Sequence, residues 1–125
     1  PAHRCAVRAD RHPVHRCVQA VLSFVAHGLD DFRAFDPPLR YPVPEGASAQ
    51  CVYFRGGNES DALICVVLTC DDEPMRLFPL GARQALHVPL RITEELLTDR
   101  TLELHVAAPA GIEGTVVVDL GILEL

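Results

Sequence analysis

The sequence predicts a mainly β protein, an antiparallel β-sandwich with one N-terminal helix. From residue 49 onward, short apolar runs separated by turn residues recur at spacings of roughly ten residues, which is typical of a sandwich. Strands and helical segments do not alternate, and this disfavours a parallel α/β fold. With 125 residues, 49% of them hydrophobic, the chain is expected to be a single domain over 1–125 that buries a core without disulfides or metal.

Residues 1–12 are expected to form a basic arm. Residues 1–17 contain four arginines and one aspartate, whereas the whole chain has a net charge of −6. An arm of opposite sign is expected to dock on the acidic body or on a neighbouring subunit. Nucleic acid is not an expected partner, because the domain as a whole would repel phosphate.

Residues 13–29 are predicted to form the helix. Pro13 suits the first helical position and Gly28 suits a C-terminal cap. Apolar residues follow at helical spacing, namely Val14, Val18, Val21, Val25 and Phe32. This helix would be apolar over most of its girth, so a sheet and a partner chain would have to cover it. A strand over 18–24 is the alternative, because the segment is rich in β-branched residues; the helix is the favoured interpretation.

Residues 30–48 are predicted to be a proline-rich ordered connector, either a loop or an edge. The segment contains Pro37, Pro38, Pro42 and Pro44, which exclude a regular helix and disfavour a central strand.

The remaining elements are expected to be strands at 50–55, 63–69, 75–80, 86–92, 102–106 and 115–125. The run 63–69 is apolar on both faces and predicts a central strand. Pro89 places its strand at an edge, and Gly121 indicates a bulge in the last strand. Residues 93–96 could form one helical turn.

Three segments of 49–125 resemble the galactose-binding and carbohydrate-binding jelly-roll modules, namely Val52-Tyr-Phe-Arg-Gly-Gly-Asn58, Leu102-Glu-Leu-His-Val-Ala-Ala-Pro-Ala-Gly111 and Gly114-Thr-Val-Val-Val-Asp-Leu-Gly-Ile-Leu123. The resemblance implies a jelly-roll sandwich that binds a sugar or another small polar ligand, with Ca²⁺ as a bound ion. Such modules stack sugars on exposed aromatics, whereas this chain has no Trp and only two Tyr.

A near-repeat at the start of the chain could bind metal. Pro1-Ala-His-Arg-Cys5 recurs as Pro13-Val-His-Arg-Cys17, and His12 lies between them. Imidazole and thiolate ligands suit Zn²⁺ or copper, and in an extended segment a His and a Cys two apart point to the same side. The candidate ligands are His3, Cys5, His12, His15 and Cys17, although a solvated basic arm is the favoured interpretation.

Two further groups are weighed as metal ligands. His87 and His105 lie on the polar faces of two late strands and would be neighbours if those strands pair. The acids of two loops, Glu59 with Asp61 and Asp71 with Asp72 and Glu73, could hold Ca²⁺. Surface histidines and solvated turns are favoured for both groups.

No catalytic pattern is present in the sequence. The chain lacks a G-x-S-x-G elbow, and all of its basic side chains are arginine, which excludes Schiff-base chemistry and a P-loop. Five cysteines without a C-x-x-C pair favour a reducing, cytoplasmic setting. The polar, basic start lacks the pattern of a signal peptide, and no apolar run reaches the roughly 18 residues of a membrane span.

The sequence therefore predicts a non-catalytic module for protein–protein interaction or self-assembly, with no cofactor and no membrane partner. The partner is expected to be another protein or a second copy, in a homo-oligomer or a larger complex. The expected partner-binding residues are Arg4, Arg8, Arg11 and Arg16 with Val14, Val18, Val21 and Val25. The alternatives are a jelly roll that binds a carbohydrate or small ligand, with Ca²⁺, and a small metal-binding protein that uses the N-terminal His/Cys cluster with Zn²⁺.

Overall fold

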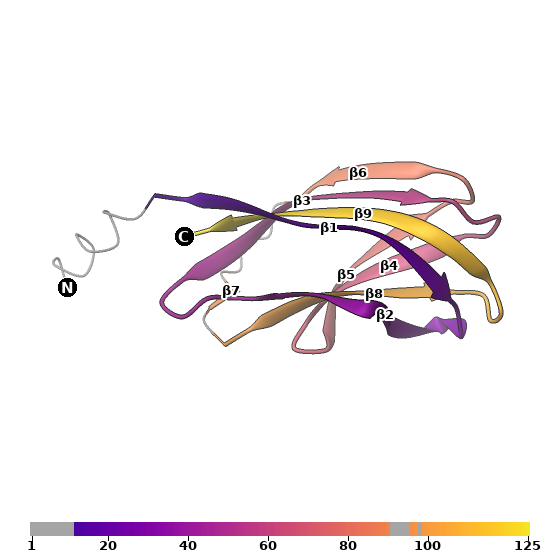
Figure 1. Ribbon diagram of the computed structural model, residues 1–125, viewed down its shortest axis with the longest axis horizontal. Coiled ribbons are helices and arrows are strands. Elements are labelled where there is room, and N and C mark those ends of the chain that lie inside the picture. Colours follow the sequence, from indigo (N-terminus) through magenta and orange to yellow (C-terminus); the bar gives the residue numbers. More distant parts are fainter. Residues whose placement is uncertain (1–11, 91–95, 98) are drawn as a thin grey trace, which may run out of the picture.

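The computed structural model describes residues 12–90, 96–97 and 99–125, which form two antiparallel sheets compatible with a β-sandwich (Figure 1). Figure 1 shows β6, β3, β9 and β1 in one layer, with β2 and β8 in the other. The strands are β1 (Val14–Val25), β2 (Gly28–Pro42), β3 (Ser48–Asn58), β4 (Ile64–Cys70), β5 (Glu73–Leu80), β6 (Ala85–Pro89), β7 (Leu96–Leu97), β8 (Thr101–Ala108) and β9 (Glu113–Glu124).

The chain crosses repeatedly between the two sheets. Sheet A has the order β1-β9-β3-β6, with the short β7 also paired to β3, and sheet B has the order β2-β8-β4-β5. Among the described strands, only β4 and β5 are neighbours both in sequence and in a sheet. The last strand, β9, lies between β1 and β3, so the two ends of the described chain are adjacent in sheet A.

The predicted N-terminal helix is wrong, because residues 14–25 form strand β1. Leu22 and Phe24 are 6% and 7% exposed, whereas Val21 and Val25 are 70% and 57% exposed, which is the alternation of a strand. The valine spacing fits a helix only by coincidence. Pairing with β9 and burial of alternate residues decide the conformation, since helix propensity is a weak preference. The described residues include no helix that could cross a membrane.

Most of the proline-rich segment 30–48 forms β2, which lies at an edge of sheet B. Its pairing with β8 is interrupted between Gly28 and Arg33 and again between Ala34 and Leu39. The cis peptide bond Asp36–Pro37 lies in the second interruption. An irregular edge strand accommodates prolines, because it does not need every backbone N–H for pairing.

The later strands agree closely with the sequence pattern. The run predicted as central becomes β4, which lies between β8 and β5, and Pro89 lies in the edge strand β6. Gly56 and Gly57, expected to end a strand, instead continue β3 and pair with Leu86 and Ala85. Residues 93–95 of the predicted helical turn lie outside the described residues, and residue 96 belongs to β7. Residues 1–11 of the predicted arm also lie outside the described residues.

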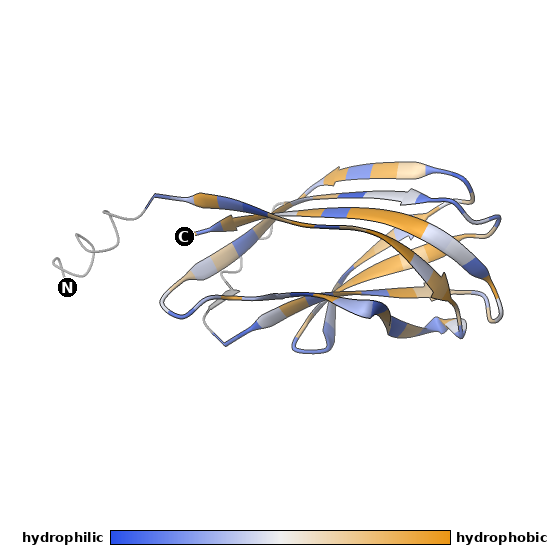
Figure 2. Cartoon of the chain, in the orientation of Figure 1, coloured by the Kyte–Doolittle hydropathy of each residue, from blue (hydrophilic) through white to orange (hydrophobic). Residues whose placement is uncertain are grey.

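The core lies between the sheets, where the apolar residues of the strands meet (Figure 2). Phe54 of sheet A and Phe78 of sheet B stack with ring centroids 4.1 Å apart and planes 5° apart. The inward side chains of β9 are at most 1% exposed, namely Val116, Val118, Leu120 and Ile122. Burial on this scale, at about 25 cal/mol per Å² of apolar surface, is the main force holding the two sheets together.

The expected irregularity near Gly121 lies on the neighbouring strand. Cys51 pairs with Ile122 and Tyr53 pairs with Gly121, so Val52 is an extra residue in β3. The ring of Tyr53 lies directly on Gly121, where an added Cβ would come within 2.0 Å of a ring carbon. Gly121 is therefore required by close packing against an aromatic ring.

Gly121→Ala is expected to destabilise the fold by about 1–3 kcal/mol, because the added methyl must displace the Tyr53 ring. Gly57→Ala is the matched control, since its Cβ would lie 3.9 Å from the nearest neighbour, an ordinary contact. Urea denaturation of both variants measures the two costs. Equal losses would show that glycine flexibility, rather than the Tyr53 contact, sets the effect.

Candidate functional site

The outer edge of β1 is the least protected edge of the described sheets. The other long edge strands carry prolines, with Pro89 in β6, Pro74 and Pro79 in β5, and three prolines in the interrupted β2. β1 has twelve residues, no proline and an uninterrupted register with β9. Within the described part of the chain, its backbone makes no hydrogen bond to other backbone groups except in the ladder with β9. Such an edge is a template for another strand.

An apolar row crosses the outer face of sheet A from β1. Val21 lies opposite Val117 of β9, which lies opposite Gly57 of β3, which lies opposite Ala85 of β6. Val21 and Val117 are 70% and 44% exposed. A shallow hollow of about 520 Å³ lies over the same strands, lined by Arg55, Gly56, Gly57, Ala85, Leu86, His87, Val117 and Asp119. The row continues the exposed apolar side of β1 across the sheet.

A polar cluster centred on Tyr53 borders this row. The Tyr53 hydroxyl donates to Asp119 Oδ1 at 3.0 Å and lies 3.4 Å from Cys17 Sγ. The hydrogen bond with Cys17, burial and the bond to Asp119 raise the pKa of Tyr53. The Arg55 guanidinium lies 4.9 Å from the ring centroid, and the His87 ring packs edge-on at 6.1 Å. These side-chain contacts connect the three neighbouring strands β1, β9 and β3.

The predicted partner-binding residues divide between surface and core. Val14, Val21 and Val25 are exposed, whereas Val18 is half-buried and packs against the core. Arg16 is exposed and lies 3.5 Å from Glu124, which also accepts a hydrogen bond from Tyr41. Arg4, Arg8 and Arg11 lie outside the described residues.

The predicted N-terminal metal ligands are only partly described. His12 is exposed just before β1, His15 and Cys17 are exposed in its first part, and His3 and Cys5 lie outside the described residues. Because β1 is extended, His15 and Cys17 do share one side of the strand. His87 and His105 lie in different sheets, so these two strands do not pair.

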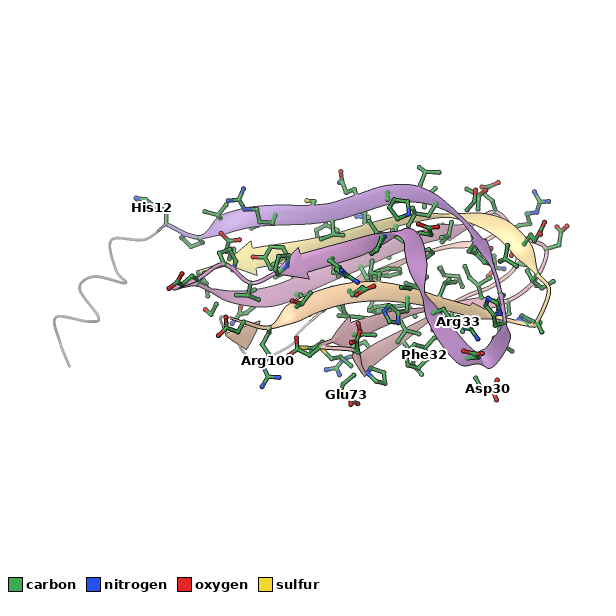
Figure 3. The ribbon with its side chains drawn as sticks, turned by 60° about the horizontal axis from the view of Figure 1, so that its bottom comes forward. His12, Asp30, Phe32, Arg33, Glu73 and Arg100 are labelled. Carbon is green, nitrogen blue, oxygen red and sulfur yellow. The ribbon has the colours of Figure 1, made fainter. Side chains whose placement is uncertain are left out.

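In the described ranges, one group of three side chains has the spacing of metal ligands, and it lies on sheet B. The ligand atoms of Asp72, Glu103 and His105 all lie within 4.8 Å of one another. Glu103 and His105 are 6% and 8% exposed, and Phe32 packs on His105 with ring centroids 5.7 Å apart. Figure 3 shows Phe32 on the irregular first part of β2. The sequence indicated Asp72 and His105 separately but did not indicate Glu103.

A hollow between the first two strands is a weaker candidate. It measures about 720 Å³ and lies where β1 turns into β2, with His27, Arg33, Asp36 and Glu113 among its lining residues. These four residues are all exposed. Arg33 is already paired with Asp31 at 3.0 Å, and this hydrogen bond lowers the pKa of Asp31. Fully solvated charges of this kind do not favour a specific ligand.

The described thiols should differ sharply in reactivity. Cys17 is exposed, whereas Cys51 is 1% exposed and burial raises its pKa to about 12. The thiolate is the reactive form, so iodoacetamide at pH 8 should modify Cys17 at least about 100-fold faster than Cys51. Peptide mapping of timed samples measures both rates. Similar rates in the native protein would contradict the packing of β3, whereas similar rates in urea are expected.

No protein-family model matches this chain, and no curated protein matches its sequence. The resemblance to galactose-binding and carbohydrate-binding modules therefore has no support from a family model or a homologue. Two features of the described structure are candidate sites: the unprotected edge of β1 on sheet A and the cluster of Asp72, Glu103 and His105 on sheet B.

Proposed function

We propose that this chain is a non-catalytic jelly-roll module that assembles with a second copy of itself through strand β1. The strand orders β1-β9-β3-β6 and β2-β8-β4-β5 support the jelly roll, in which eight strands form two four-stranded sheets. The observation that carries the assembly is the edge of β1, which is long, regular and free of proline while the other long edges are interrupted or carry proline.

A second copy fits this edge because β1 is suited to antiparallel pairing with itself. Arg16 is the only Arg, Lys, Asp or Glu in β1, and it lies near the start of the strand. Antiparallel pairing about the strand centre places Arg16 opposite the uncharged end, Ser23–Val25, so like charges do not meet. The resulting interface is isologous, since the same edge is used by both copies, and it closes as a two-fold dimer.

The exposed valines favour this arrangement. Val21 and Val25 are exposed on the outer face of sheet A, in the half of β1 that carries no charge, so they do not oppose the approach of a second copy. The two sheets A would join into one continuous sheet and satisfy the outer backbone groups of both β1 strands. The predicted contribution of Arg4, Arg8 and Arg11 to this assembly stays a prediction.

The described aromatic side chains support sugar binding less well than they support assembly. The Tyr53 ring lies against Gly121, with Arg55 over it, and the Tyr41 hydroxyl is bonded to Glu124. Neither ring is an open stacking platform of the kind that carbohydrate modules use, so an assembly role accounts better for the exposed face of sheet A.

Val21→Lys is expected to convert the dimer to a monomer, because a charge on an edge strand opposes strand addition. Val117→Lys is the matched control: it adds the same charge beside Val21 on the same face, but on β9, which has a partner on each side. Size-exclusion chromatography with light scattering gives the mass of each variant.

A dimer that is lost in Val21→Lys and kept in Val117→Lys supports pairing through the edge. Loss in both variants would point to stacking of the outer faces of sheet A and overturn the edge model. A monomeric unmodified chain would overturn self-assembly and leave a foreign strand as the candidate partner.

A further inference from the structure

We infer that Asp72, Glu103 and His105 form a binding site for a divalent first-row transition metal, with Zn²⁺ the best match. The site lies on the outer face of sheet B and is independent of the proposed pairing through β1. Three features carry it: a rigid platform, a buried histidine without a hydrogen bond, and a carboxylate oxygen already at the spacing of a metal ligand.

The platform is strand β8, which is paired on both sides with β2 and β4. Glu103 and His105 are two residues apart, so their side chains point to the same face. Thr69 of β4 lies opposite Glu103 and its hydroxyl donates to the Glu103 carbonyl at 2.9 Å. The backbone that carries two of the ligands is therefore held in place before any ion binds.

The third ligand comes from the turn between β4 and β5. Asp71 and Asp72 have φ of 49° and 68°, and this left-handed pair reverses the chain. Asp71 anchors the turn, since its carboxylate accepts from the Thr101 backbone N–H at 2.9 Å and from Arg100 at 3.0 Å. The backbone hydrogen bond from Thr101 and the Arg100 contact lower the pKa of Asp71. Asp72 remains exposed, with its carboxylate near Glu103 and His105.

His105 supplies the observation that points to a ligand. It is 8% exposed, and neither Nδ1 nor Nε2 makes a hydrogen bond. Leaving a buried polar group without a partner costs about 1–3 kcal/mol, and such groups are rare in folded proteins. A neutral imidazole nitrogen is a preferred metal ligand, so a bound ion would use the lone pair that the protein leaves without a partner.

The two carboxylate oxygens of Glu103 have different surroundings. Oε1 accepts a hydrogen bond from Arg40 Nε at 3.0 Å, whereas Oε2 lies 3.4 Å from His105 Nε2. Ligand atoms about 2.1 Å from a tetrahedral Zn²⁺ lie about 3.4 Å from each other. Oε2 and Nε2 therefore already have the separation of two ligands of one ion. Asp72, within 4.8 Å of both, completes a three-ligand set by a small side-chain rotation.

The donor set selects the class of metal. An imidazole nitrogen disfavours Ca²⁺ and Mg²⁺, which take oxygen ligands, and the absence of sulfur from the set disfavours Cu(I). A simple ion pair between Glu103 and a protonated His105 is the competing arrangement, but Glu103 already has Arg40 as its cationic partner.

Co²⁺ titration of the full chain, followed by visible absorption and by competition with Zn²⁺, tests the site. Asp72→Asn and Glu103→Gln should each weaken binding about 10-fold or more, because each removes an ionised ligand. Glu73→Gln is the matched control, since it removes an exposed carboxylate next to Asp72 that lies outside the ligand set. Circular dichroism verifies that each variant is folded, and Asp72→Asn changes only an exposed turn residue.

The spectrum separates this site from the N-terminal His/Cys cluster. A site made of imidazole and carboxylates gives weak visible bands, whereas cysteine ligands add an intense sulfur-to-metal charge-transfer band. One equivalent bound without the sulfur band, weakened by Asp72→Asn but not by Glu73→Gln, supports the inference. Less than stoichiometric binding, binding seen only with the sulfur band, or equal affinity in Asp72→Asn overturns it.

Discussion

Strand β9 holds β1 in place through twelve consecutive residue pairs, from Val14 with Glu124 to Val25 with Glu113. The other side of β9 pairs with β3, and its inward side chains are buried in the core. β1 therefore has a firm partner on one side and no backbone partner, among the described residues, on the other. This one-sided pairing determines where the side chains and the backbone of β1 lie. Alternate residues point into the core, Val21 and Val25 stay in solvent, and the outer backbone groups form a long regular edge.

The fold could be predicted where the signals are local. The apolar run of β4 and the alternation of β8 and β9 are readable in short windows, and the structure has strands there. The error at 13–29 arose because Val14, Val18, Val21 and Val25 are spaced three or four apart. In a strand, Val14 and Val18 lie on one face, and Val21 and Val25 lie on the other. The two-residue spacing of Leu22 and Phe24 is the better signal, because it has the period of a strand. The conformation of this segment depends on pairing with β9, about a hundred residues further along the chain, which no local window contains.

The sites depend on non-local pairing even more strongly. The prolines of β2, β5 and β6 are visible in the sequence, but which strands lie at edges is known only from the sheet order. In the sequence, Asp72 is an acid of a predicted turn and His105 is a histidine of a predicted strand. They meet because β4 pairs with β8 in the register Val67 with His105, which returns the following turn to the outer face of sheet B. Glu103 had no signal of its own, since an acid alternating with leucines on a strand is expected to be solvated.

The two proposed sites can act separately because the core lies between them. The β1 edge belongs to sheet A, whereas the ligands of the proposed metal site face outward from sheet B. The sheets contact each other through packed side chains such as the buried Phe54–Phe78 stack. An ion that joins the β4–β5 turn to β8 changes contacts on the outer face alone, and groups so far apart without shared partners are expected to contribute additively. Assembly through β1 should therefore depend on the regularity of its pairing with β9, and metal affinity on the rigidity of β8.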